Sequence, residues 1–239
     1  GRSVMAPAAP NLPPVPLELG GKAPAVVCPD FPLDRAAARI ATGKWFNAGQ
    51  TCIGVDYVLV DETRAGAFVE ALQSELRARY PDFANTADYT RIINDAQYAR
   101  LRGYVDDARS RGVIVVEPLT ATLDAGARTR LQDERLFPPT LLVDPPADSQ
   151  AMRNEIFGPI LPVLPYRTLD EAIARIQSMD RPLALYPFSD DARSVEKIVS
   201  GAPAGGGTLN DTLLHLRAHD LPFGGIGPSG IGAIHGRTG

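Results

Sequence analysis

The sequence predicts an α/β fold with a mostly parallel sheet flanked by helices. Short apolar runs alternate with longer amphipathic stretches along the 239 residues, which is typical of parallel strands joined by crossover helices. Hydrophobic residues make up 44% and charged residues 22% of the chain, the balance of a globular protein with a buried core. The longest apolar runs, such as residues 160–166, are far too short to cross a membrane.

The elements follow in order. The stretch 6–16 contains five prolines, and it is predicted to be extended or irregular because proline fixes φ and lacks an N–H. Beyond it, apolar runs predict strands at 24–29, 56–61, 113–117, 140–144, 160–164 and 183–189, with one more short strand within 206–211. Amphipathic stretches predict helices at 33–46, 63–80, 95–112, 168–179 and 190–201.

Apolar spacing supports these helices. In the stretch 63–80, apolar side chains recur at the i, i+3, i+4 positions of one helical face. The stretch 95–112 ends in Gly112, a residue suited to the position just after a helix. The predicted inward face of the helix 63–80 comprises Ala65, Phe68, Val69, Leu72 and Leu76.

Charge and cysteine content exclude several classes of protein. The 24 Lys and Arg residues against 28 Asp and Glu residues give a net charge of −4, which predicts no nucleic-acid surface. Two cysteines form neither a disulfide framework nor, alone, a zinc site. The first residues contain no apolar secretory segment. We therefore expect a protein of the reducing cytoplasm, with no membrane and no nucleic-acid partner.

Cys52 is the first candidate for chemistry. It lies in "FNAGQTCIG" (46–54), where turn-forming and polar residues surround the thiol. A cysteine nucleophile needs access, a nearby base or a lowered pKa, and donors for the oxyanion that it creates. Gly49 and Gly54 allow tight turns that aim backbone N–H groups at such an oxyanion. Cys28, at the end of the apolar run "AVVCPD", is interpreted as a buried structural thiol.

Glu18 is the second candidate. It stands between Leu17 and Leu19 and before two glycines, in "LELGGK" (17–22). If the leucines face a core, Glu18 points the other way from a strand end and could activate a water molecule as a base. The residue pattern alone fits a solvent-facing glutamate of an edge strand equally well.

The glycine-rich and histidine-containing segments favour structural roles. "GGIGPSG" (224–230) matches G-x-G-x-x-G, but no clear strand precedes it and prolines interrupt it, so a flexible turn is predicted. His215 and His219 could share a helical face, whereas His235 is isolated. No third ligand stands at matching spacing, and no metal site is predicted.

These pieces together resemble the aldehyde dehydrogenase superfamily. "LELGGK" (17–22) and "FNAGQTC" (46–52) are similar to its general-base and nucleophile signatures, and Glu18 and Cys52 are 52 − 18 = 34 positions apart, as expected for that family. "NEIFGP" (154–159) is similar to its cofactor motif, and "LNDTLLH" (209–215) and "LPFGGIGPSGIGAIHG" (221–236) to its closing segments. The sequences of the later segments, among them "NDTLLH" (210–215) and "GAIHG" (232–236), are most similar to the coniferyl aldehyde dehydrogenase branch.

The resemblance implies roles for individual residues. Cys52 is expected to be the nucleophile and Glu18 the base that activates the hydrolytic water. Glu155 is expected to bond the nicotinamide ribose, and Phe157 to pack beside the nicotinamide. Asn210 is expected in a segment that lines the active site.

The implied reaction is oxidation of an aldehyde to its carboxylic acid with NAD or NADP. The substrate is expected to be a small-molecule aldehyde, aromatic and similar to coniferyl aldehyde, or long-chain. A thiohemiacetal on Cys52 would lose hydride and become a thioester, which water then hydrolyses.

The resemblance also implies a division of the chain. Residues 1–16 are expected to be a remnant of, or linker from, a dinucleotide-binding domain that precedes the catalytic domain at 17–239. Pro7 and Pro10 are expected to break the helix that the family continues there. The isolated chain is expected to be inactive, and its parent to be a homo-oligomer. Two alternatives stay open: transfer of the acyl group to coenzyme A, and a non-enzymatic binding or assembly module.

Overall fold

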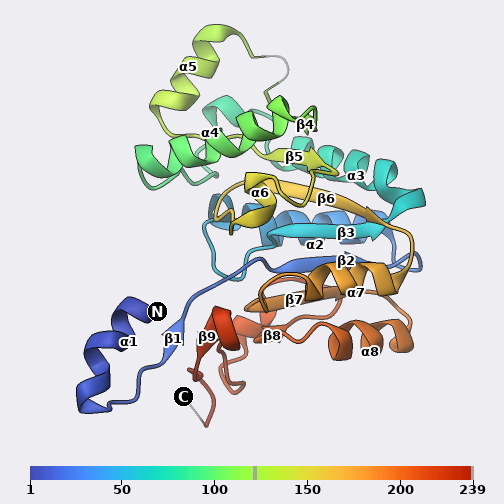
Figure 1. The fold of residues 1–239 in the computed structure, drawn as a ribbon. Helices are drawn as coiled ribbons and strands as arrows, with labels where there is room; N and C mark the ends of the chain where they lie inside the picture. Colours follow the sequence, from blue (N-terminus) through green and yellow to red (C-terminus); the bar gives the residue numbers. More distant parts are fainter. Residues whose placement is uncertain (121–122, 238–239) are drawn as a thin grey trace.

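The computed structural model describes residues 1–120 and 123–237, and it contains a seven-stranded sheet of order β4-β5-β6-β3-β2-β7-β8. Its strand pairs are parallel except β4–β5, which confirms the predicted mostly parallel sheet. Figure 1 shows this sheet through the middle of the molecule. The strands are β2 (Pro24–Val27), β3 (Tyr57–Asp61), β4 (Ile114–Val116), β5 (Thr140–Val143), β6 (Ile160–Tyr166), β7 (Ala184–Phe188) and β8 (Gly206–Gly207).

Helices cover both faces of the sheet. In Figure 1, α2 and α3 lie behind it, while α7 and α8 lie in front. Every residue of β2 and β7 is buried, as expected for parallel strands covered on both sides. The larger helices are α2 (Leu33–Trp45), α3 (Ala65–Arg79), α4 (Asp95–Ser110), α7 (Leu169–Gln177) and α8 (Ala192–Gly201).

Two apolar cores form, one on each face. Successive residues of β2 alternate between them: Val27 belongs to the core under α2 and α3, and Val26 to the core under α7 and α8. Four of the five side chains predicted to face inward from α3 are buried, and Ala65 is partly buried against the same core. No helix within the two described ranges is long and apolar enough to span a membrane.

Several short elements did not follow from the sequence. Helix α5 (Ala125–Asp133) buries only Leu131, so its apolar periodicity is weak. Helix α6 (Gln150–Arg153) has a single turn. Strands β1 (Leu17–Glu18) and β9 (Gly230–Ile231) pair antiparallel as a separate two-residue ladder. The 3₁₀ turns are η1 (Ala9–Asn11), η2 (Phe46–Gly49), η3 (Glu62–Arg64), η4 (Phe83–Asn85), η5 (Leu214–Arg217) and η6 (Gly227–Ser229).

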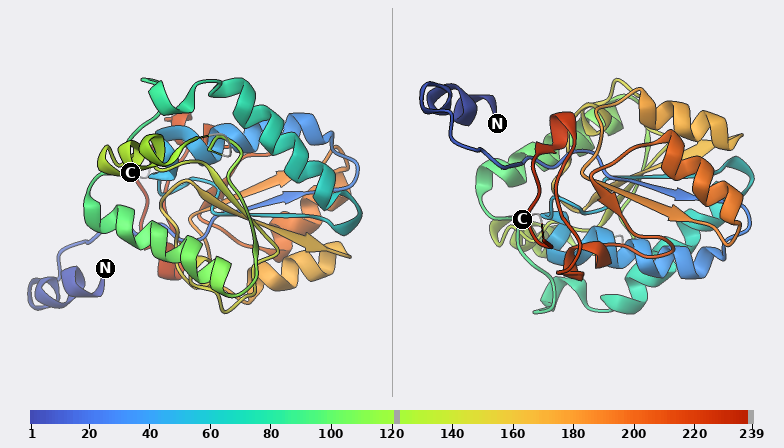
Figure 2. Two further views of the ribbon diagram at one scale, coloured as in Figure 1. Left: turned by 90° about the horizontal axis from the view of Figure 1, so that it is seen from above. Right: turned by 90° about the horizontal axis from the view of Figure 1, so that it is seen from below.

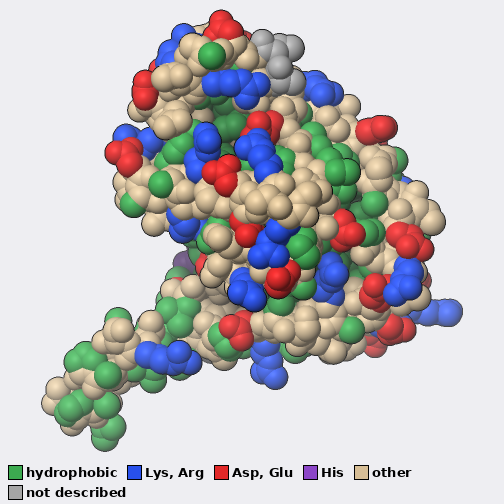
Figure 3. Space-filling view, turned by 45° about the horizontal axis from the view of Figure 1, so that its top comes forward, with side chains coloured by type: hydrophobic (Ala, Val, Ile, Leu, Met, Phe, Trp, Pro, Cys, Tyr) green, Lys and Arg blue, Asp and Glu red, His purple; other side chains and the backbone are tan. Residues whose placement is uncertain are grey.

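The start of the chain is more helical than predicted. Helix α1 (Arg2–Ala8) contains Pro7, and η1 contains Pro10. The expectation of a break is wrong for Pro7, which lies in the last turn of α1. Pro10 lies beyond the end of α1 at Ala8, near the start of a 3₁₀ turn, where a missing N–H costs little. Figures 2 and 3 show α1 projecting from the body, with apolar side chains on its surface. Residues 238–239, the end of the predicted catalytic domain, lie outside the described ranges.

Candidate active site

The candidate residues gather at the amino edge of the sheet. Strands β6, β3 and β2 are adjacent and parallel, so the segments that precede them meet at one edge. Glu18 lies before β2, Cys52 before β3, and Glu155 and Phe157 before β6. The topology therefore brings together four of the five residues predicted from the sequence.

A tightly turned loop carries Cys52. Asn47 and Ala48 in η2 have φ of 51° and 52°, and Gly49 follows at 73°. Three successive left-handed residues reverse the chain directly after α2, an arrangement that only surrounding contacts can maintain. The N–H of Gly54 then donates to the carbonyl of Thr51 at 2.9 Å. Cys52 thus lies inside a hydrogen-bonded turn, half-buried rather than sealed in the core.

Gln50 ties this loop to the rest of the protein. Its amide donates to the carbonyls of Asn47 and Arg91 at 3.2 and 3.1 Å, and its oxygen accepts the N–H of Ile93 at 3.0 Å. A polar residue of the motif is therefore structural. It fixes the backbone two residues before the thiol.

The nucleophile loop also touches the loop that carries Glu155. A Cβ on Gly49 would stand 2.6 Å from the carbonyl carbon of Gly158, so only glycine permits this backbone approach. The indole N–H of Trp45, at the end of α2, donates to the carbonyl of Pro159 at 3.1 Å. The two loops are held in a fixed relation.

Glu155 lies over the glycines that follow Glu18. A Cβ on Gly20 would stand 2.8 Å from its carboxylate oxygen Oε1. Burial, and secondly the charge of Asp56, raise the pKa of Glu155 to about 7. The next residue but one, Phe157, has φ of 44° and an exposed side chain. A half-buried carboxylate and an exposed ring therefore lie two residues apart in the loop at this edge.

Glu18 occupies the short ladder that closes the site. It pairs with Gly230 across β1 and β9, and it is exposed whereas Leu17 is buried, as predicted for a strand end. Partial burial raises the pKa of Glu18, while the charge of His235 opposes this rise. His235 was interpreted from the sequence as isolated, but the fold brings it near Glu18.

Electrostatics link the thiol to both carboxylates. Burial raises the pKa of Cys52, the backbone N–H groups of Ile53 and Cys52 itself lower it, and the charges of Glu155 and Glu18 raise it further. These two N–H groups therefore face the thiol, and their use as oxyanion donors, which the glycine-containing motif predicts, stays a prediction. The net effect raises the pKa of the Cys52 thiol, and because the thiolate is the nucleophile, the attack requires a proton acceptor.

The second thiol has different surroundings. Cys28 is buried just after β2, at the opposite end of that strand from Glu18, and its N–H donates to Phe188. Burial raises the pKa of Cys28 to about 11. This environment fits the structural interpretation.

Asn210 is the candidate that the fold does not bring to this edge. It follows β8, and its amide oxygen accepts the N–H of Ser189 at 2.9 Å while its NH₂ donates to the Ser189 carbonyl at 3.1 Å. Ser189 follows β7, so Asn210 lies at the carboxyl ends of these strands. A role for Asn210 in lining the active site stays a prediction. In the structure its side chain satisfies both backbone polar groups of Ser189.

The glycine-rich segment forms the predicted turn, and side-chain hydrogen bonds hold it. The N–H of Ile226 donates to the hydroxyl of Ser229 at 2.9 Å, and that hydroxyl donates back to the Ile226 carbonyl at 3.0 Å. Strand β9 follows directly. These contacts lock the turn in place, which the proline and glycine content alone did not reveal.

The histidines form no metal centre in the described part of the chain, where no group of three or more His, Cys, Asp or Glu side chains could hold an ion. His215 lies between the rings of Tyr186 and Phe223. His219 and His235 stand 5.5 Å apart, centroid to centroid.

Comparison with known proteins places the chain in a family. The family model described as "Aldehyde dehydrogenase family" matches residues 1–239. The chain belongs to the aldehyde dehydrogenase family. Over 239 residues it is 48% identical to a Pseudomonas aeruginosa protein named "Probable coniferyl aldehyde dehydrogenase", covering 100% of this chain and 48% of that protein. It is 42% identical over 238 residues to "Aldehyde dehydrogenase, dimeric NADP-preferring" of Rattus norvegicus, covering 99% and 49%.

Solved structures agree with this assignment to the aldehyde dehydrogenase family. A Staphylococcus aureus AldH in a substrate-bound state superposes with a TM-score of 0.90 at 41% identity, covering 100% of this chain and 50% of that one. A Mycobacterium tuberculosis aldehyde dehydrogenase complexed with NAD⁺ gives 0.85 at 29%, covering 100% and 48%. The chain spans about half the length of the curated relatives it matches.

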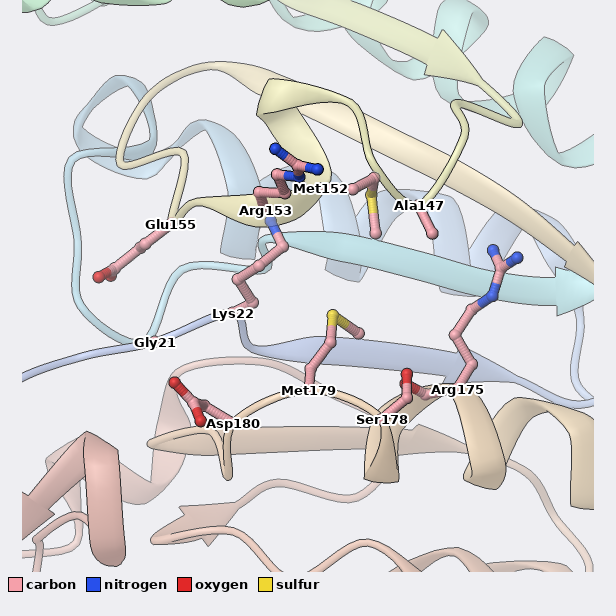
Figure 4. A pocket seen from close by; sticks show the side chains of 10 residues that line it. All are labelled: Gly21, Lys22, Ala147, Met152, Arg153, Glu155, Arg175, Ser178, Met179 and Asp180. Atoms are coloured by element: carbon pink, nitrogen blue, oxygen red, sulfur yellow. The ribbon is translucent and has the colours of Figure 1, made fainter.

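The residues beside Glu155 suit a cofactor of the kind that aldehyde dehydrogenases use. A pocket of about 440 Å³ adjoins it, and Figure 4 shows its lining, with Glu155 at one end and Lys22 in the wall. A carboxylate accepts hydrogen bonds from sugar hydroxyls, and an exposed ring such as Phe157 offers a stacking face. Cys52, Glu18 and Phe157 do not line this pocket. Glu155 and Phe157 together line a second pocket, which Gln50 of the nucleophile loop also lines.

Proposed function

We propose that the protein carrying this chain oxidises an aldehyde to its carboxylic acid with NAD⁺ or NADP⁺, and that residues 17–239 form its catalytic domain. One observation carries the proposal. Cys52, the single half-buried thiol of the described residues, lies within electrostatic range of two carboxylates at the amino edge of the sheet. Membership of the aldehyde dehydrogenase family supports it.

Cys52 performs the first step. Glu18, one of the two carboxylates in electrostatic range of the thiol, accepts its proton and passes it to solvent before the second step. The sulfur attacks the aldehyde carbonyl, a C–S bond forms, and the carbonyl π electrons move to oxygen. The backbone N–H groups that face the thiol stabilise this oxyanion. When bound, NAD(P)⁺ supplies the hydride acceptor that turns the thiohemiacetal into a thioester.

Glu18 performs the second step. Burial raises the pKa of Glu18. A general base works best when its pKa lies near the operating pH, because it is then both ionised and basic enough to take a proton. Glu18 removes a proton from water, the hydroxide oxygen attacks the thioester, and the C–S bond breaks to release the acid. A base placed for hydrolysis favours water over coenzyme A as the acyl acceptor.

Glu155 and Phe157 hold the cofactor in this proposal. Glu155 accepts hydrogen bonds from the ribose next to the nicotinamide, and Phe157 packs against the nicotinamide ring. The proposal rests on the half-buried carboxylate, the exposed ring and the pocket that both residues line together with Gln50.

The proposed substrate is an aromatic aldehyde of the coniferyl type, or a long-chain aldehyde. The names of relatives motivate both classes: coniferyl aldehyde dehydrogenases and a "4,4'-diaponeurosporen-aldehyde dehydrogenase" of Staphylococcus aureus at 42% identity. We further propose a homo-oligomer, since one relative is named dimeric, and a cytoplasmic protein without nucleic-acid or membrane partners.

The decisive experiment measures reduction of NAD⁺ and NADP⁺ by absorbance, with cinnamaldehyde-type and long-chain aldehydes, in the full-length protein. Cys52→Ala should abolish turnover, and Cys28→Ala, the matched control at the other thiol, should retain it. Turnover that survives Cys52→Ala would reject the proposed nucleophile. Absence of turnover with every aldehyde would leave a binding or assembly role instead.

A further inference from the structure

A buried ion pair stands directly behind the candidate site. Lys22, the last residue of "LELGGK", pairs with Asp56, the residue before β3, and the two side chains are 9% and 4% exposed. They are 34 positions apart in the sequence. Neither residue has a role in the chemistry proposed above.

We propose that Asp56 and Lys22 are positioning residues that set Glu155 and Phe157 for the cofactor and couple them to the nucleophile loop. The inference deepens the proposed function and rests on the cofactor roles given there to Glu155 and Phe157.

The contacts of Asp56 carry the first part of the argument. Its Oδ1 accepts the N–H of Ile156 at 2.9 Å, the residue between Glu155 and Phe157. The carbonyl of the same residue accepts a hydrogen bond from Arg100 at 2.7 Å. Ile156 is therefore held on both sides, which maintains the left-handed φ of 44° at Phe157 against its intrinsic cost.

The contacts of Lys22 carry the second part. Its ammonium donates to the carbonyl oxygens of Ala151 and Asn154 at 2.7 and 2.9 Å. All three of its N–H bonds are thus used, one on Asp56 and two on the segment that leads into Glu155. The pair fixes residues 151–156 from two ends at once.

The pair also connects this segment to the nucleophile. Asp56 lies four residues after Cys52, and its own N–H donates to the carbonyl of Ala23 at 2.8 Å. One residue, Asp56, therefore links the start of β2, the start of β3 and the loop before β6 through its backbone N–H and its carboxylate. A displacement of any one of these three changes the distance between thiol and cofactor loop.

Stability alone does not explain such a pair. Desolvation of two charges offsets much of their attraction, so a buried ion pair contributes little net stability. A second pair of this kind holds the residue just before this segment: Asp107 pairs with Arg111 at 2.9 Å and accepts the N–H of Gln150 at 2.9 Å. Asp107 bonds to no residue of 151–156 and is more exposed, 13% against 4% for Asp56, so it is the control for loss of one carboxylate next to the segment.

The test compares four variants of the full-length protein: Asp56→Ala, Asp56→Asn, Asp107→Asn and Glu155→Gln. For each, the KM for NAD(P)⁺ and the rate of hydride transfer are measured beside hydrolysis of an activated ester, which needs Cys52 and no nicotinamide. Asp56→Ala should raise the cofactor KM or slow hydride transfer by about 10- to 100-fold through misplacement, while ester hydrolysis changes by less than about threefold. Asp56→Asn, which keeps an acceptor for the Ile156 N–H, should recover part of this loss. Asp107→Asn should match the parent.

The outcomes separate this inference from the proposed function. Equal loss of both activities in Asp56→Ala would overturn the inference, because it would show a merely structural role. So would parent-like kinetics of Asp56→Ala alongside an impaired Glu155→Gln. A Glu155→Gln variant with unchanged cofactor kinetics would instead reject the proposed role of Glu155. If Asp56→Ala does not fold, the double variant Lys22→Met with Asp56→Leu carries the same expectation, because it removes both buried charges together and also the acceptor for the Ile156 N–H.

Discussion

Replacing Gly49 by alanine tests the contact between the two loops. The residue has φ of 73°, and a non-glycine residue in that region costs about 1–2 kcal/mol. The new Cβ would stand 2.6 Å from the Gly158 carbonyl carbon, where real Cβ contacts essentially never fall below 3.0 Å. The neighbour is backbone and cannot rotate away, so overpacking adds about 1–3 kcal/mol. The free energy of unfolding should therefore fall by about 2–5 kcal/mol.

The same change should separate Cys52 from the loop of Glu155 and Phe157. Urea unfolding measures the stability loss, and reduction of NAD(P)⁺ measures the functional loss, which we expect to be on the order of 10²-fold for a displacement approaching 1 Å. Gly103→Ala, inside α4 with nothing within 4 Å of the new Cβ, is the control and should stabilise by about 0.5–1 kcal/mol. A Gly49→Ala protein with the urea midpoint and turnover of the parent would refute the reasoning.

Three further predictions concern titratable groups at or near the site. Limiting iodoacetamide should label Cys52 before the buried Cys28, as mapped by mass spectrometry, and preferential labelling of Cys28 would reject the assignment. Glu18→Gln in the full-length protein should leave the acylation burst intact while steady-state turnover falls by roughly 10²- to 10⁴-fold; near-parental turnover would make Glu18 a structural carboxylate. The pKa of Glu155 is raised from its ordinary 4.5 to about 7, so its stabilising contribution is full below pH 4.5 and is lost as the pH rises through 7. Glu155→Gln should therefore unfold with a flatter pH profile between these values, and an unchanged profile would contradict the raised pKa.

The central sheet and its helices followed from the sequence because their signals are local. In α3, apolar residues recur on one face, and in the parallel strands continuous apolar runs mark burial on both sides. Helix α5 escaped prediction because Leu131 is its only buried residue. Pro7 misled the prediction for α1, since a proline in the final turn removes a single hydrogen bond rather than the helix.

Only part of the candidate site was predicted from local sequence patterns. Local composition singled out Cys52 and Glu18, whereas Glu155 and Phe157 came from resemblance alone. The sequence did not predict that Asp56 bonds to the Glu155 loop or that His235 lies near Glu18, because both contacts join segments that are far apart in the chain.

The candidate site lies at the edge of the sheet opposite to the usual one in α/β proteins, and it contains buried charges. Ligands of open parallel sheets generally bind beyond the carboxyl ends of the strands, yet Glu18, Cys52 and Glu155 all precede their strands. Buried charges of both signs lie there: Lys44 is buried, and desolvation lowers its pKa to about 8 against the attraction of Asp56. With Lys22, two lysines stand against Asp56 and Glu155. Such a group of charges is costly to bury, and its location beside the loops of Cys52 and Glu155 is the one that our proposal requires of charges that set the distance between these loops.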